Sequence, residues 1–87
     1  MRIWFKEFKD NHLLRDTVIE RNEADTRTHK VFAALEEACY LFDLGKPLWL
    51  DATVAEFKRH SRARFTQDNF VETIEFDYLE MHVIEED

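Results

Sequence analysis

The most concentrated positive charge in the sequence lies in residues 58–64, KRHSRAR. This stretch places Lys58, Arg59, Arg62 and Arg64 within seven positions and adds His60. Guanidinium groups offer paired donors in a fixed fork that matches a phosphate group. The stretch therefore predicts phosphate chemistry, in the first place nucleic-acid binding.

A competing interpretation comes from the distribution of acidic residues. Every Lys and Arg lies at or before Arg64, whereas residues 65–87 carry eight carboxylates and no base. Like charges without a counter-ion repel one another, and the basic stretch lies directly upstream. We therefore expect the four basic side chains to pair with the acidic final segment, within the molecule or across an interface, and we keep phosphate binding as the alternative.

Other reactive residue types do not form a catalytic or metal-binding pattern. The four histidines are scattered, and none has a neighbour at metal-ligand spacing. Cys39 lies beside a stripe of apolar residues, which favours packing over nucleophilic chemistry. Ser61 lacks the glycines of a nucleophile elbow, and a chain with one glycine cannot build a phosphate-cradling loop. We predict no catalytic residue, metal or cofactor, and hence no enzyme.

The aromatic residues suggest a different kind of site. The chain has 12 aromatic side chains, more than one face of a small sheet needs. Exposed apolar patches usually mark a partner surface. We predict a partner-binding surface that contains Trp4, Phe8, Trp49 and Tyr78. An aromatic-rich monomer core is the competing interpretation.

Length and composition predict one domain spanning residues 1–87, with a formal net charge of −7. A single cysteine cannot form an internal disulfide, and no apolar run approaches the roughly 20 residues of a membrane span. The first residues, MRIWFKEFKD, are too charged for a signal peptide. These features predict a cytoplasmic protein.

The elements that must position these residues follow from local patterns. Residues 1–21 predict a β-hairpin with Asp10 and Asn11 as its turn, because both types tolerate positive φ. A helix is expected from about residue 25 to Gly45, and Pro47 prevents its continuation.

The second half of the chain predicts two more helices and a strand. A second helix begins near Asp51 or Thr53 and reaches about His60. Thr66, as an N-cap, predicts a third helix to about Ile74. The final residues alternate as one strand. The order ββ-α-α-α-β predicts an α+β fold, a small three-stranded antiparallel sheet with helices on one face.

Several blocks of the sequence resemble those of a family of short, uncharacterised proteins from Gram-positive anaerobic bacteria. The similar blocks cover nearly the whole chain: HLLRDTVIE, DTRTHKVFAAL, LFDLGKPLWLD, EFKRHSRARFTQDNF and FDYLE. The resemblance implies a bacterial, intracellular protein. It implies no catalytic residues.

Taken together, the sequence predicts a small, acidic interaction or regulatory module in the cytoplasm. It would bind a protein partner, or itself as a homodimer, through the aromatic-rich sheet surface, without a small-molecule substrate or a membrane. Nucleic-acid binding by residues 58–64 is the first alternative. In a third interpretation, the carboxylates of residues 68–87 mimic nucleic acid and engage a basic partner.

Overall fold

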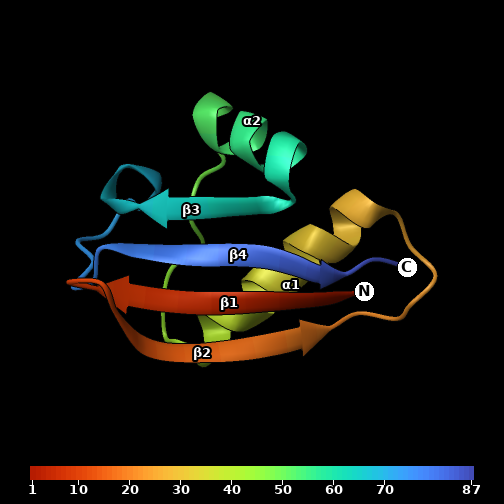
Figure 1. The fold of residues 1–87 in the computed structure, drawn as a ribbon, viewed down its shortest axis with the longest axis horizontal. Helices are drawn as coiled ribbons and strands as arrows, with labels where there is room; N and C mark the ends of the chain where they lie inside the picture. The colour runs from red at the N-terminus through yellow and green to blue at the C-terminus, as the bar shows by residue number, and fades with distance from the viewer.

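The computed structural model describes residues 1–87 as a four-stranded antiparallel sheet with two α-helices (Figure 1). The spatial order of the strands is β2-β1-β4-β3. The elements in chain order are β1 (Arg2–Lys9), β2 (His12–Glu20), α1 (Arg27–Leu41), α2 (Asp51–His60), β3 (Arg62–Thr66), the 3-10 helix η1 (Gln67–Asn69) and β4 (Tyr78–Glu85).

The predicted fold, with three strands and three helices, is therefore wrong. Residues 62–66 form β3, which pairs with β4 and was not expected. The predicted third helix is only η1, although Thr66 does cap it: its hydroxyl accepts from the backbone N–H of Asp68 at 3.3 Å. The helix stops because Phe70 turns to an extended backbone and packs its ring against Phe76, with ring centroids 5.9 Å apart.

The β1-β2 hairpin forms around the expected turn. Asp10 and Asn11 have φ values of 51° and 63°, the left-handed conformation that a two-residue hairpin turn requires. The pairing register shifts between Glu7 and Phe8, which marks a β-bulge. The last strand, β4, then adds to the free side of β1.

Helix α1 begins and ends at side chains that fit those positions. Thr26 is the N-cap, and its hydroxyl accepts from the backbone N–H of His29 at 3.2 Å. The helix ends at Leu41, and Asp43, with φ of 57°, supplies the stop that was predicted at Gly45. The backbone N–H of Leu44 donates to the carbonyl of Cys39 at 2.8 Å and that of Asp43 to Tyr40 at 3.2 Å. This pair of bonds is the Schellman arrangement, with Asp43 in the place usually taken by glycine.

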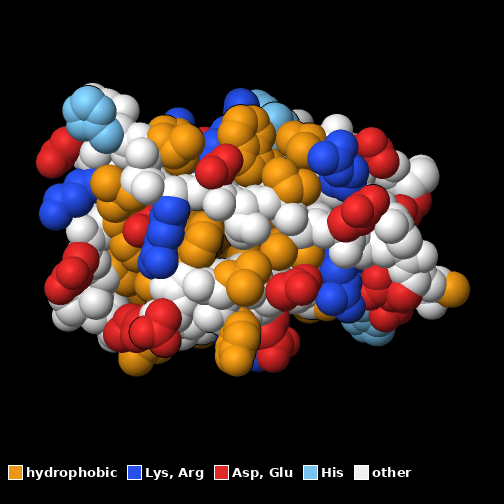
Figure 2. All heavy atoms as spheres, turned by 90° about the horizontal axis from the view of Figure 1, so that it is seen from below, with side chains coloured by type: hydrophobic (Ala, Val, Ile, Leu, Met, Phe, Trp, Pro, Cys, Tyr) orange, Lys and Arg blue, Asp and Glu red, His pale blue; other side chains and the backbone are white.

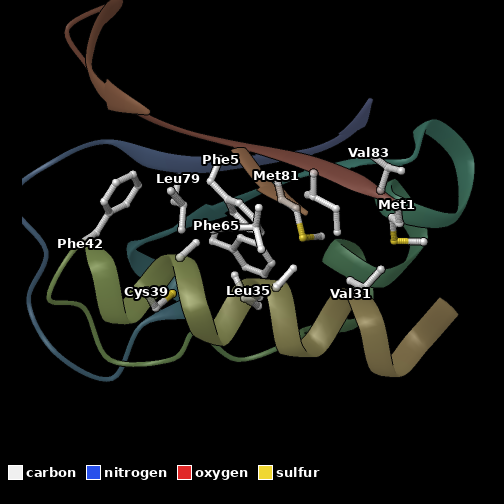
Figure 3. Close-up of a cluster of buried hydrophobic side chains, with 14 of the residues drawn as sticks. Met1, Phe5, Val31, Leu35, Cys39, Phe42, Phe65, Leu79, Met81 and Val83 are labelled. Atoms are coloured by element: carbon white, nitrogen blue, oxygen red, sulfur yellow. The ribbon is translucent and has the colours of Figure 1, made fainter. Parts of the chain in front are cut away.

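The core lies between α1 and one face of the sheet (Figure 3). Figure 3 shows Phe5, Phe65, Leu79 and Met81 pointing from the strands toward the helix, and all four are fully buried. Alternate residues of a strand point to opposite faces, so the residues between them point away from the helix. Since α1 lies behind the sheet in Figure 1 and α2 lies beside β3, the face nearest the viewer has no covering element.

Candidate interaction surface on the open face of the sheet

The open face of the sheet is defined by the side chains that alternate with the core residues. Strand register arranges them in three rows across the strands. One outer row is Val18, Trp4, His82 and Arg62, the middle row is Asp16, Lys6, Glu80 and Arg64, and the other outer row is Leu13, Phe8, Tyr78 and Thr66. Aromatic residues therefore lie on both sides of a charged row.

The middle row, which we call the charge ladder, alternates in sign across the four strands. The Nζ of Lys6 lies 2.9 Å from a carboxylate oxygen of Glu80, and the Nε of Arg64 lies 3.5 Å from the other. At the β2 end, Asp16 accepts a hydrogen bond from the indole Nε1 of Trp4 at 2.8 Å. Negative and positive groups thus follow one another from β2 to β3.

Glu80 is the most enclosed group of the ladder, with its side chain only 8% exposed. Burial alone would raise its pKa, but the hydrogen bonds and charges of Lys6 and Arg64 outweigh burial and lower the pKa below its ordinary value. Glu80 is therefore ionised at neutral pH. Its negative charge holds two cations in place between the aromatic rows.

Two of the three aromatic rings of the open face are held by the same charges, and the third packs against one of them. Lys6 lies over the Trp4 ring at 4.0 Å from its centroid, and Arg64 lies over the Tyr78 ring at 4.6 Å. Phe8 packs against Tyr78 with ring centroids 5.2 Å apart. All three rings are half-buried. Rings held in this way lose little side-chain freedom when a partner covers them.

Trp49, the fourth residue of the predicted partner surface, lies elsewhere. Its ring packs edge-on against Phe65 and Phe57, with centroids 5.1 and 5.7 Å away. It also lines a groove of about 260 Å³ between α1 and α2, together with Phe32. The structure thus brings Trp4, Phe8 and Tyr78 together and places Trp49 on the helix side of the molecule.

The four basic residues of the 58–64 stretch are divided between two elements. Lys58 and Arg59 lie in the last turn of α2, whereas Arg62 and Arg64 project from β3 onto the open face. Only Arg64 forms an ion pair, with Glu80. Within one molecule, the expected pairing of this stretch with the acidic segment is therefore wrong for Lys58, Arg59 and Arg62.

Bases from the first 30 residues pair with four of the eight carboxylates of the acidic segment instead. The pairs join Arg2 to Glu85 at 3.8 Å, Lys6 to Glu80 at 2.9 Å, Arg27 to Glu86 at 2.9 Å and Lys30 to Asp87 at 2.5 Å. The reason is topological, because β4 lies beside β1 and its end reaches α1. The same neighbours lower the pKa of Glu86, through a hydrogen bond from Arg27, and that of Asp87, through one from Lys30.

The β2 flank extends the open face toward the edge of the sheet. Leu13 and Val18 are 47% and 42% exposed, although they are large and apolar. Figure 2 views the molecule from this side and shows hydrophobic side chains gathered among acidic and basic groups. No other element covers the outer edge of β2.

Several residues of this surface were missed by sequence reasoning. Asp16, Lys6 and Glu80 carry the charge ladder, and Val18 and His82 complete an outer row. The alternation within each strand was visible in the sequence, but the order of the strands was not. Without that order, four charges from four strands cannot be assigned to one row.

The single cysteine of the chain lies in the hydrophobic core. Cys39 is buried, and burial, with a smaller contribution from Glu72, raises its pKa to about 11, so the thiol stays protonated at neutral pH. No three His, Cys, Asp or Glu side chains are arranged to hold a metal ion. None of the helices is both long and apolar enough to cross a membrane.

No model of a known family, no curated protein and no solved structure matches this chain. The resemblance to short proteins of Gram-positive anaerobic bacteria stays a prediction.

Proposed function

We propose that this protein is a small, non-enzymatic binding module of the bacterial cytoplasm that recognises a protein surface, another protein or a second copy, through the open face of its sheet. The observation that carries the proposal is the uncovered face with Trp4, Phe8 and Tyr78 in two rows around the charge ladder. Tryptophan, tyrosine and arginine are the residues that dominate binding energy in protein interfaces.

The charges on this face favour a protein over a nucleic acid. Single-strand binders stack bases on free aromatic rings in a positive groove. Here Lys6 and Arg64 already cover Trp4 and Tyr78, and both cations are tied to Glu80. The ladder has no net charge, and its carboxylates would repel phosphates. A polar, sign-alternating surface suits a protein partner of complementary charge.

Photo-crosslinking in cells tests this proposal. Val18 or Thr66, both exposed on the open face, would be replaced by p-benzoylphenylalanine, and Tyr40, 84% exposed on α1, would serve as the matched control. We expect protein adducts from the two open-face positions and none from position 40. Adducts from position 40 alone, or from no position, would contradict the proposal.

Nucleic-acid binding is a second candidate, supported by the three basic residues without an ion pair, Lys58, Arg59 and Arg62. Removing a cation that contacts phosphate lowers affinity and reduces the salt slope by about one for each contact. Titration with labelled single-stranded DNA and RNA at low and moderate salt would measure both. Arg62→Ala should then weaken binding more than Arg64→Ala, because Arg64 is held by Glu80. No binding at low salt removes this candidate.

A further inference from the structure

We infer that the partner of the open face is a second copy of this chain, packed face to face about a twofold axis that runs parallel to the strands. This inference rests on the proposed function. It comes from the order of signs in the charge ladder, which is negative, positive, negative, positive from β2 to β3.

When a row of four alternating charges is reversed and laid over itself, every charge lies opposite a charge of the other sign. A twofold axis along the strands, placed between two stacked sheets, lays β2 of one copy over β3 of the other and β1 over β4. Asp16 then faces Arg64 of the second copy, and Lys6 faces Glu80. All four contacts of the ladder join opposite charges.

The other twofold arrangement of two stacked sheets does not have this property. An axis across the strands lays each strand over itself, and when it runs over the ladder Asp16 faces Asp16 and Lys6 faces Lys6. Like charges placed opposite each other across an interface are a strong discriminator against a wrong orientation. The ladder therefore selects the axis along the strands.

The two outer rows fit the same arrangement. With the axis along the strands, Trp4 faces His82 of the second copy, and Phe8 faces Tyr78. Both contacts join ring to ring. Arg2, beyond the first row, comes to face Glu85, which it already approaches within its own chain at 3.8 Å. No row brings together two groups of like charge.

The geometry of stacked sheets allows these contacts. Aligned sheets pack about 10 Å apart with their strands rotated by about 30°, which inclines the twofold axis by about 15° to the strand direction. Strands lie about 4.8 Å apart, so the outer strands are about 7 Å from the axis, and that rotation displaces their ladder residues by about 4 Å. An arginine side chain such as Arg64 spans that distance. The central contact, Lys6 with Glu80, lies nearest the axis and is displaced least.

The size of the face predicts a reversible dimer. Four strands and about eight residues of strand length cover roughly 19 by 26 Å, or about 500 Å² for each copy. The total of about 1,000 Å² is at the lower limit for specific interfaces. We therefore expect association in the micromolar range.

Reciprocal charge reversal at the edge of the ladder tests the inference. Asp16 and Arg64 are suitable because both are exposed and neither lies in the core. Arg64→Glu brings a second carboxylate opposite Asp16, and Asp16→Lys brings a second cation opposite Arg64. Each variant alone should therefore dimerise at least about tenfold more weakly. An equal mixture of the two restores both opposite-charge contacts and should dimerise like the wild type, as measured by sedimentation equilibrium.

Controls separate this effect from folding and from net charge. Arg59→Glu makes the same change in net charge as Arg64→Glu, but on α2, and should leave dimerisation unchanged. Circular dichroism verifies the fold of each variant. Asp16→Asn keeps an acceptor for the Trp4 indole, so it separates the loss of charge from the loss of that hydrogen bond. A mixture no more associated than its components, or a wild type that is monomeric at about 1 mM, would overturn the inference. Crosslinks from Val18 or Thr66 to another protein would then leave the proposed function standing.

Discussion

Replacing Glu80 by Gln should reveal how strongly the charge ladder stabilises the fold. The substitution keeps the shape of the side chain and removes the charge that Lys6 and Arg64 share. Lys6 is 14% exposed and Arg64 is 56% exposed, so one of the two pairs is nearly buried and the other is open to solvent. Breaking a buried pair costs about 3–5 kcal/mol and an exposed pair about 0–1 kcal/mol. We expect an intermediate loss of about 2 kcal/mol at pH 7.

The pH dependence of that loss identifies its cause. Burial opposes the ionisation of Glu80, but Lys6 and Arg64 outweigh burial and lower its pKa in the folded protein. A lowered folded pKa means that the stabilisation is complete above the unfolded pKa of about 4.3 and disappears as the pH falls through the folded value. The difference between wild type and Glu80→Gln should therefore stay constant between about pH 7 and pH 5 and shrink as the pH falls below about 4.3 and through the folded pKa.

Urea unfolding followed by tryptophan fluorescence measures this difference. For an m value of about 1 kcal/mol/M, the midpoint should fall by about 2 M at pH 7. Glu85→Gln is the matched control, because Glu85 is 61% exposed and meets Arg2 only at 3.8 Å, and its midpoint should hardly move. A loss below about 0.5 kcal/mol for Glu80→Gln, or one that stays constant with pH, would refute the assigned role of the ladder.

Three other predictions test the core, the hairpin turn and the buried thiol. Phe65→Ala removes a fully buried ring that packs on Trp49, so thermal unfolding should show a loss of about 3–5 kcal/mol; a loss below about 1 kcal/mol would contradict the packing. Asn11→Ala should cost about 1 kcal/mol in chemical unfolding, whereas Asn11→Gly should not, because φ at this position is 63°; equal effects would contradict the turn. Cys39 should react with a thiol reagent at pH 8 only after denaturant is added, and fast reaction in the native protein would contradict its burial.

The sequence was most informative where the local signal was complete. Asp10 and Asn11 identified the hairpin turn, and an apolar stripe from Val31 to Phe42 identified α1. Strand β3 was missed because Arg62 and Arg64 dominate its five residues, and only Ala63 and Phe65 face the core. A strand this short is recognised by its pairing with β4, which the local sequence does not contain.

The helix ends show how tertiary contacts override local signals. Gly45 was the expected stop of α1, but Asp43 adopts the left-handed conformation two residues earlier. The cap at Thr66 was recognised, yet the following helix is only one turn long. At the end of this turn, the side-chain amide of Asn69 donates to the Leu48 carbonyl and to the Thr53 hydroxyl, both at 2.8 Å.

The candidate surface was partly predictable for the same reason. Trp4 and Phe8 share a face because they are four residues apart in one strand, and Tyr78 joins them through the register of β1 with β4. Trp49 lies in the connection between the two helices, where no periodicity indicates the direction of its side chain. The charge ladder depends on the order of all four strands and was not predictable.

The central claim is that the partner binds the open face of the sheet. The two indole N–H signals in a proton–nitrogen correlation spectrum test it most directly. Trp4 lies on the open face and Trp49 lies on the helix side, so each reports on one side of the same molecule. The spectrum would be followed as the partner is added, which for a second copy means raising the protein concentration. We predict that the Trp4 signal moves and saturates while the Trp49 signal stays in place. Movement of Trp49 with Trp4 unchanged would place the interface on the helices and contradict the claim.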